Sequence, residues 1–407
     1  MSSPAFQPQP GGGPHPALAG GPIYLDYNAT TPVDPGVLEA ALPYLSTHFG
    51  NPSSGHRYAD APHRALAVAR AQVAALIGAR APEIVFTASG SEANLLALRG
   101  VVLASGHPRP HVITQVTEHP AVLETCRALQ RLHGVRLTVL PVDGDGLVAP
   151  AALAEALRPD TVLVSVMAAN NETGALQPVA RLAALARRQG ALFHCDAAQA
   201  AGKIPLDITE LGADLLTVVG HKMYAPKGIA ALYVREGVTL EPVVYGGGQE
   251  RGLRAGTENV ALAVALGTAA RLAAEHLADG AATRLAALRD SLHRRLAGAL
   301  PGRVHLNGPG TGRLPNTLNV SIDGVLGHEL LAAAPGLAAS TGSACHSGAH
   351  TPSPVLTAMG LVRSRALGAV RLSLGRWSTP ADIETAATTL IEAAATLGKG
   401  TSASSHE

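Results

Sequence analysis

Lysine, aromatic residues and cysteine are all scarce in this chain of 407 residues. Aromatic residues make up 3% of the sequence and charged residues 15%, with a net charge of +1. The composition therefore offers neither the stacking platforms nor the basic patch of a nucleic-acid-binding protein. The most apolar stretch, residues 260–274, contains polar residues and is too short to span a bilayer. No basic segment followed by an apolar one marks a signal peptide, and we expect a cytoplasmic protein without a membrane partner.

The three cysteines, Cys126, Cys195 and Cys345, are widely spaced and odd in number. This pattern favours neither a disulfide framework nor a metal site, and it suits a reducing compartment. Cys126 falls within a predicted helix and Cys195 within a predicted strand, so we interpret both as core residues. Cys345 lies between Gly342 and Gly348, and we predict that it is exposed on a flexible loop, where a cysteine can act as a nucleophile.

The order of apolar segments predicts an α/β fold. Strands and helices alternate from about residue 84 to residue 195, which indicates a mostly parallel central sheet with helices on both faces. A long helical region rich in Ala, Leu and Arg follows, and then a second, smaller α+β domain. The predicted segments are a disordered tail (1–21), a large domain whose first residues could pack with the small one (22–270), the small domain (271–397) and a polar tail (398–407).

Only four of the 31 basic residues are lysines: Lys203, Lys222, Lys227 and Lys399. A carbonyl cofactor could be attached only through one of them, because the guanidinium of arginine stays protonated and is a poor nucleophile. Lys399 lies in the tail, Lys203 in an apparent loop and Lys227 in a Pro-Lys-Gly turn. Lys222 follows a buried strand, where a lysine is unfavourable unless it has a partner or a task. Lys222 is therefore the candidate, and a paired structural lysine is the alternative.

Polar residues follow several predicted strands at their carboxyl ends, where ligands collect in open α/β sheets. Ser89-Gly90-Ser91 opens a helix after a strand, and a glycine-containing helix N-terminus suits a phosphate. Asp196 ends another strand and needs a cationic partner, such as a pyridinium nitrogen. The remaining candidates at this edge are His119, Asn171 and Gln199. An ordinary helix cap, a structural histidine and a simple turn are the plainer alternatives for single motifs, but their convergence predicts one site.

Ten segments from about residue 23 to residue 395 resemble cysteine desulfurases, in order along the chain. The segments are LDYNATTPVDPGV (25–37), GNPSSGH (50–56), SGSEAN (89–94), TEHPAVLETC (117–126), NNETG (170–174), DAAQAAGKIPLDI (196–208), GHKMYAPKGIAALYV (220–234), GGGQERGLRAGTEN (246–259), STGSACHS (340–347) and RLSLGR (371–376). Cysteine desulfurases are pyridoxal-phosphate enzymes with the fold of type I aminotransferases, class V.

The resemblance implies a role for each matching residue. Lys222 resembles the lysine that binds the cofactor and later carries a proton. The implied cofactor contacts are Asp196 to the pyridine nitrogen, Gln199 to the ring hydroxyl, His119 stacked on the ring, Gly90, Ser91 and His221 at the phosphate, and Thr257 reaching the phosphate of the other subunit. Asn171 and Arg371 resemble the holders of the substrate carboxylate, and Cys345 resembles the nucleophile. The family also implies a homodimer and a sulfur-acceptor protein such as an iron–sulfur scaffold.

Val219 departs from the pattern, because many cysteine desulfurases have serine at this position. Its missing hydroxyl would remove about 1 kcal/mol of phosphate binding, the usual worth of one neutral hydrogen bond. Selenocysteine lyases look similar at this position and in GGGQER (246–251), RLPNTLNVSI (313–322), GSACHS (342–347) and PSPVL (352–356). L-selenocysteine therefore stays an alternative substrate to L-cysteine. Another pyridoxal-phosphate reaction, such as transamination or β-elimination, and a scaffold without activity are the remaining alternatives.

Overall fold

The computed structural model describes residues 15–342 and 351–403. Cys345, the predicted nucleophile, lies outside these residues. The prediction of disorder over residues 1–21 is wrong for residues 15–21. His15 caps a short 3-10 helix, η1 (Pro16–Leu18), and its Nε2 lies 2.9 Å from the carbonyl oxygen of Val33. The His15 ring also packs edge-on against Trp377, with centroids 4.6 Å apart, so this segment is held to the folded body.

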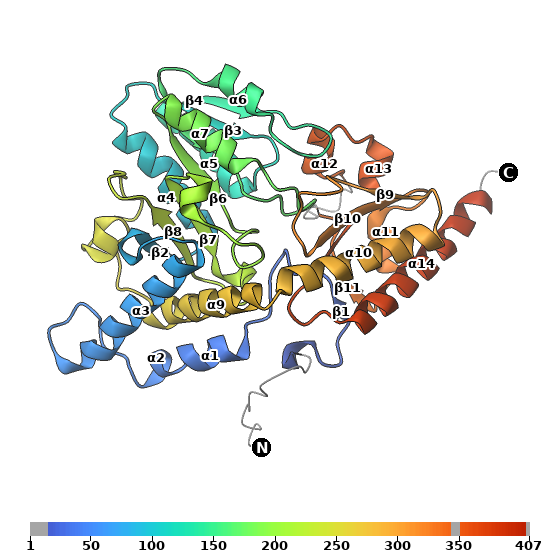
Figure 1. The fold of residues 1–407 in the computed structure, drawn as a ribbon, viewed down its shortest axis with the longest axis horizontal. Coiled ribbons are helices and arrows are strands. Elements are labelled where there is room, and N and C mark those ends of the chain that lie inside the picture. The colour runs from blue at the N-terminus through green and yellow to red at the C-terminus, as the bar shows by residue number, and fades with distance from the viewer. Residues whose placement is uncertain (1–14, 343–350, 404–407) are drawn as a thin grey trace.

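A seven-stranded sheet forms the centre of the larger part of the molecule (Figure 1). In spatial order its strands are β2 (Ile84–Thr87), β8 (Ala230–Val234), β7 (Leu215–Val219), β6 (Leu192–Asp196), β5 (Thr161–Ser165), β3 (His111–Gln115) and β4 (Arg136–Leu140). All pairs are parallel except those of β8, which runs antiparallel to both β2 and β7. The predicted mostly parallel sheet is confirmed. Its strands read as continuous apolar runs because helices cover both faces.

The helices pack on the sheet in two layers, each with its own apolar cluster. Successive residues of a strand point to opposite faces of the sheet and so belong to different clusters. Ile84 and Ile113 belong to the first cluster, and Val85 and Val112 belong to the second. The first layer contains α3 (Asp60–Leu76), α6 (Pro150–Ala156), α7 (Val179–Arg188), α8 (Ile208–Leu211) and α9 (Val260–Ala278), with α1 (Pro35–Ala41) and α2 (Pro43–Ser46) outside α9. The second contains α4 (Gly90–Ala104) and α5 (Pro120–His133). Short 3-10 helices lie at η2 (Arg57–Ala59), η3 (Ala81–Glu83), η4 (Gly220–Lys222) and η5 (Gln249–Gly252).

Helix α9 is, within the described ranges, the one helix long and apolar enough to cross a membrane by length and composition. Its apolar character has another explanation, because 56% of the helix window is buried inside the protein. A Cβ on Gly267 would lie 2.6 Å from the Cα of Ala69 in α3, so the two helices approach closely at this glycine. This close packing is typical of a core helix.

The smaller part of the molecule has a separate apolar cluster built on an antiparallel sheet, β12 (Ala369–Ser373), β10 (Thr317–Ile322) and β9 (Val304–Leu306). Its helices are α10 (Ala281–Ala299), α11 (Gly327–Ala332), α12 (Pro354–Ala358), α13 (Arg363–Leu367) and α14 (Pro380–Ala403). Helix α14 continues past residue 397, where the sequence predicted the start of a mobile tail. The change of apolar cluster falls between α9 and α10, slightly beyond the predicted boundary at residue 270.

The first ordered residues join the small part before the chain enters the large one. Strand β1 (Ile23–Tyr24) pairs in parallel with β11 (Leu337–Ala338), and Leu25 is fully buried in the small apolar cluster. Residues 26–31 then run between the two parts to reach α1. This crossing segment is placed against the carboxyl ends of the central strands, and it supplies much of the site described next.

Candidate active site

Lys222 lies in η4, directly after β7, and its amine faces the crossing segment. Its Nζ donates to the carbonyl oxygens of Asn28 at 2.6 Å and Ala29 at 2.7 Å. Burial, together with the positive charge of Arg371, lowers the pKa of the Lys222 amine to about 8. A lysine with this pKa has a substantial neutral fraction near neutral pH, and the neutral amine is the nucleophilic form.

Asp196 is held at the carboxyl end of β6 with both oxygens already oriented. Oδ2 accepts a hydrogen bond from Nδ2 of Asn94 in α4 at 2.8 Å, and Oδ1 accepts one from the backbone N–H of Ala198 at 2.9 Å. Only 6% of the residue is exposed. Asn94 lies in the SGSEAN segment, yet its side chain was not predicted to contact this acid. A buried carboxylate with fixed orientation is suited to bind a cationic N–H group.

His119 caps α5 and presents its ring at the mouth of the same region. Its Nδ1 accepts a hydrogen bond from the backbone N–H of Ala121 at 3.1 Å, which leaves Nε2 to carry the proton of the neutral ring. The side chain is exposed, and the backbone at residue 119 continues directly from β3 through a short turn. An exposed aromatic ring at a strand end can stack against a flat ligand.

The N-terminus of α4 lies beside the turn that carries Lys222. A Cβ on Gly90 would lie 2.5 Å from Cγ2 of Val219, so only glycine permits this contact. Ser91 is exposed in the first turn, where the leading N–H groups of a helix have no intrahelical partner. His221 Nδ1 lies 3.1 Å from Thr30 Oγ1, and burial and the charge of Lys222 lower the pKa of His221 to about 4. This arrangement provides uncharged donors for an anion at a helix N-terminus.

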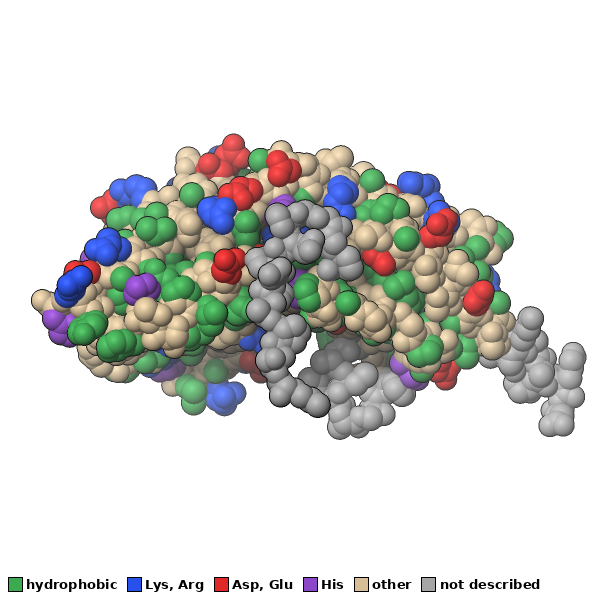
Figure 2. Space-filling model, turned by 90° about the horizontal axis from the view of Figure 1, so that it is seen from below, with side chains coloured by type: hydrophobic (Ala, Val, Ile, Leu, Met, Phe, Trp, Pro, Cys, Tyr) green, Lys and Arg blue, Asp and Glu red, His purple; other side chains and the backbone are tan. Residues whose placement is uncertain are grey.

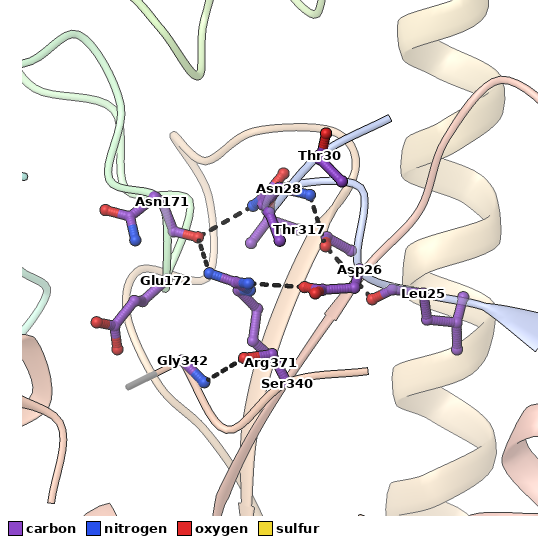
Figure 3. Close-up of polar contacts among 12 residues, drawn as sticks. Leu25, Asp26, Asn28, Thr30, Asn171, Glu172, Thr317, Ser340, Gly342 and Arg371 are labelled. Carbon is purple, nitrogen blue, oxygen red and sulfur yellow. Dashed lines mark hydrogen bonds and ion pairs between the residues drawn. The ribbon is translucent and has the colours of Figure 1, made fainter. Parts of the chain in front are cut away.

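Arg371 reaches from β12 to the crossing segment, as Figure 3 shows. Its Nη2 pairs with Oδ1 of Asp26 at 2.7 Å, and its Nη1 donates to the carbonyl oxygen of Asn171 at 3.2 Å. Asn171 thus contacts Arg371 through its backbone. Arg371 is 5% exposed, and its buried Nε has no hydrogen-bond partner among the described residues. An unpaired buried guanidinium N–H is a ready donor for a carboxylate ligand.

Asn28 and Lys203 are central to the site, although no site role was predicted for either residue. Asn28 is 1% exposed, and its backbone oxygen accepts hydrogen bonds from Lys222 Nζ and, at 3.0 Å, from Gln199 Nε2. Lys203 was assigned to an apparent loop and set aside. In the structure its Nζ donates to Gln199 Oε1 at 2.6 Å and to Asn28 Oδ1 at 3.0 Å. The side chains of Lys222, Gln199 and Lys203 therefore all donate hydrogen bonds to Asn28.

Two buried glutamates lie beside the site, in polar segments that follow predicted strands, but neither was predicted to have a role. Glu118 Oε1 accepts hydrogen bonds from Met167 N at 2.6 Å and Gln115 Nε2 at 3.0 Å. Burial, and secondarily the charge of Asp196, raises the pKa of Glu118 to about 8. Glu172 accepts a hydrogen bond from Ser353 Oγ at 2.5 Å, and burial raises its pKa as well. Their neighbours His119 and Asn171 were predicted, but no sequence pattern reveals that an adjacent carboxyl is buried.

Two predicted residues lie apart from this group. Thr257 is exposed before α9 and lines a cavity of about 250 Å³ with residues of β2 and η5, including Phe86 and Glu250. Cys345 lies outside the described residues. The other predicted residues converge at the carboxyl edge of the sheet: Gly90, Ser91, His119, Asn171, Asp196, Gln199, His221, Lys222 and Arg371.

The chemistry of these side chains fits pyridoxal phosphate. Lys222 provides an amine with a lowered pKa, and Asp196 provides a buried acceptor with fixed oxygens. The α4 N-terminus suits a phosphate, and the unpaired Arg371 Nε suits the carboxylate of an amino acid. Among residues 15–342 and 351–403, no cluster of His, Cys, Asp and Glu could hold a metal ion.

A family model described as aminotransferase class-V matches residues 23–385. With this site on this fold, the match defines an enzyme of the aminotransferase class-V family. Cysteine desulfurase 2 of Trichormus variabilis is 46% identical over 364 residues, covering 89% of this chain and 90% of the relative. The cysteine desulfurase IscS of Dictyoglomus turgidum is 44% identical over 363 residues, covering 89% and 91%. The chain belongs to the cysteine desulfurase group of this family.

Solved structures agree with this assignment. A NifS-like protein superposes with a TM-score of 0.85 at 35% identity, covering 91% of this chain and 98% of that chain. A structure described as SspA in complex with cysteine gives a TM-score of 0.77 at 36% identity, with coverages of 86% and 98%. The α/β fold predicted from the sequence resemblance is confirmed.

Proposed function

We propose that this protein removes sulfur from L-cysteine, yielding L-alanine and a persulfide on Cys345, with pyridoxal phosphate bound through Lys222. One observation carries the proposal. The crossing segment brings the Lys222 amine and the unpaired Nε of Arg371 to one place, through Asn28 on one side and Asp26 on the other. An amine nucleophile beside a carboxylate receptor is what an α-amino acid requires.

Each residue then has a defined task. When bound, pyridoxal phosphate supplies an electron sink for bond changes at the α-carbon of the substrate. Arg371 binds the substrate carboxylate, and the neutral Lys222 amine accepts the α-proton. Asp196, oriented by Asn94, would hold the N–H of the pyridine ring, and His119 would stack against the ring. The positions of the side chains and the resemblance to the family support these roles.

The sulfur step assigned to Cys345 rests on the resemblance. The thiolate of Cys345 attacks the substrate sulfur, so that an S–S bond forms while the substrate C–S bond breaks. The electron pair of the broken bond stays with the carbon skeleton, which takes up a proton and leaves as alanine. The persulfide sulfur then passes to an acceptor protein or is released as sulfide by a thiol such as dithiothreitol. An iron–sulfur scaffold is the proposed acceptor, and the cytoplasm is the proposed location.

We also propose a homodimer, supported by an exposed apolar surface on the first helices. Leu42, Leu45, Phe49 and Tyr58 are each more than half exposed, on α2 and the chain that leads to α3. Figure 2 looks onto the lower face of Figure 1, where α1 and α2 lie, and shows hydrophobic side chains spread over its left half. A large exposed apolar patch marks an interaction surface. Light scattering should give twice the chain mass, and Phe49→Asp should shift the protein towards the monomer. A monodisperse active monomer would contradict the proposal.

The cofactor proposal is tested by the visible absorption spectrum of the purified protein. A band from lysine-bound pyridoxal phosphate should be present, should vanish in Lys222→Ala and should persist in the matched control Lys227→Ala, since Lys227 is exposed. The same spectrum in Lys222→Ala, or no band in the wild type, would overturn the assignment of Lys222.

The reaction is tested by assaying sulfide and alanine from L-cysteine with dithiothreitol, beside selenide and alanine from L-selenocysteine. Cys345→Ala should keep the cofactor band and lose sulfide production from L-cysteine. Selenocysteine is the second candidate substrate because the chain resembles selenocysteine lyases at Val219 and in the four segments quoted above. If only selenocysteine is turned over, the substrate is L-selenocysteine and not L-cysteine. If the protein instead exchanges the amino group of an amino acid with a keto acid and releases no sulfide, the reaction is a transamination and the proposed desulfuration is wrong.

A further inference from the structure

Lys203 reaches the centre of the site from a turn packed against the turn of Lys222. Gly202, which precedes it, has φ +73°. A Cβ at Gly202 would lie 2.7 Å from Cγ of Met223, the residue that follows Lys222. Only glycine fits this conformation and this contact without a shift of the backbone or of Met223. The two lysine-bearing turns are therefore fixed relative to one another.

The hydrogen bonds around Gln199 define the orientation of its amide. Its Nε2 lies 3.0 Å from the carbonyl oxygen of Asn28, and a carbonyl oxygen can only accept. The same oxygen accepts a hydrogen bond from Lys222 Nζ at 2.6 Å. The NH₂ group of Gln199 is therefore on the Lys222 side. Its Oε1 is on the opposite side, 2.6 Å from Lys203 Nζ.

The orientation of the Asn28 side chain is fixed in the same way. Its Nδ2 donates to the carbonyl oxygen of Asn171 at 3.1 Å and to Thr317 Oγ1 at 2.8 Å. Its Oδ1 accepts hydrogen bonds from Asn316 Nδ2 and Lys203 Nζ, both at 3.0 Å. Lys203 thus donates to two carbonyl oxygens that belong to two oriented amides. Removing the Lys203 amine would leave Gln199 Oε1 without its donor and free the amide to turn.

Lys203 can make both hydrogen bonds whether its amine is charged or neutral. Burial, followed by the positive charges of Lys222 and Arg371, lowers the pKa of the Lys203 amine well below its usual range. A neutral amine still carries two N–H groups, enough for the two acceptors that it contacts. A solvated loop lysine would have neither these contacts nor this burial.

We propose that Lys203 is a positioning residue, which holds the Gln199 amide so that its NH₂ group faces the ring oxygen of the cofactor bound at Lys222. The inference rests on the proposed cofactor assignment and adds to it. Lys203 acts through Gln199 and does not touch the substrate. Its removal should alter the environment of the cofactor in the same way as removal of the Gln199 amide.

A double-mutant cycle on the purified holoenzyme tests this role, with Lys203→Met, Gln199→Leu and the double variant. The measurements are the pH titration of the visible cofactor band and the dissociation constant of pyridoxal phosphate for the apoenzyme. Each single variant should weaken cofactor binding by about tenfold, the worth of one lost hydrogen bond to a buried group, and should shift the titration midpoint. The double variant should match Gln199→Leu alone, because the effect of Lys203 passes through that amide. Arg294→Met, which alters an exposed cation on α10, is the control and should leave both measurements unchanged.

Independent, additive effects would overturn the proposal, and so would an unchanged titration in Lys203→Met. If Lys203→Met does not give folded protein, the cycle is run with Lys203→Ala, which also removes the donor to Gln199 Oε1. Failure of the cofactor proposal would be distinct, because the wild type would then show no band that depends on Lys222. Reduction with borohydride and mass analysis should still place the cofactor on Lys222 in Lys203→Met.

Discussion

Glu118 should make the stability of the protein depend on pH near neutrality, and Glu118→Gln should remove this dependence. Both N–H contacts of the carboxyl go to Oε1, whereas Oε2 is buried and has no partner among the described residues. Such an environment favours the protonated form, which agrees with the raised pKa of about 8. Glutamine is close to the protonated carboxyl in shape, so it can keep both contacts.

The size of the effect follows from proton linkage. The unfolded chain releases the Glu118 proton near pH ~4.3, whereas the folded protein keeps it up to a pKa of about 8. Between these values the folded state binds more protons, so the stability contributed by this group falls as pH rises and is lost above the folded pKa. From about pH 6 to about pH 8 the wild type should lose about 2 kcal/mol of unfolding free energy through this residue.

Urea unfolding of wild type and Glu118→Gln at these two pH values measures the difference. The variant should gain about 2 kcal/mol on the wild type between the two conditions, and the comparison cancels the other titrating groups. Glu124→Gln, in the helix α5 that follows Glu118, is the matched control, since Glu124 is exposed and should show no such gain. An identical pH dependence in wild type and Glu118→Gln would mean that Glu118 is ionised throughout, which would refute the reasoning.

Three further predictions concern the cofactor and substrate contacts. The rate at which the apoenzyme takes up pyridoxal phosphate should rise with pH through a midpoint of about 8, as the Lys222 amine loses its proton; a stopped-flow rate independent of pH would contradict this. Arg371→Gln should raise the KM for L-cysteine by about 10–100-fold, because a charge-assisted carboxylate contact is lost and Asp26 loses its partner; an unchanged KM would remove Arg371 from the substrate site. Gly90→Ala should destabilise the protein by about 1–3 kcal/mol through its clash with Val219, and Val219→Ala should restore stability in the double variant; thermal melts that show no rescue would exclude this clash as the cause.

Much of the fold could be predicted because each strand carries its own apolar pattern. The alternation of strands and helices defines a mostly parallel sheet, and the carboxyl ends of the strands then identify the edge where polar residues meet. Lys222, Asp196 and Gln199 were selected on this local ground. Their predicted roles, like that of Thr257 on the other subunit, stay predictions that the mutants above can test.

Residues joined by tertiary contact could not be selected in this way. Asn28 contacts Lys222, Lys203 and Thr317, which are all more than 170 positions away in the sequence. The periodicity of apolar residues along one segment cannot predict contacts between residues so far apart in the sequence. Lys203 was misjudged because a glycine before a lysine usually indicates a solvated turn, whereas here Gly202 lets the turn pack tightly on Met223. The burial of Glu118 is likewise a property of the assembled sheet.

The pairing of β1 with β11 also sets an order in which the protein can mature during synthesis. Ile23 is synthesised before its partner Leu337, which is added roughly 300 residues later. At ~5–20 residues per second, roughly 15–60 s separate the two. The central sheet can fold within that interval, whereas Asp26 must await Arg371 before it is paired. The crossing segment therefore reaches its final contacts only after β12 has been synthesised, well after the strands of the central sheet.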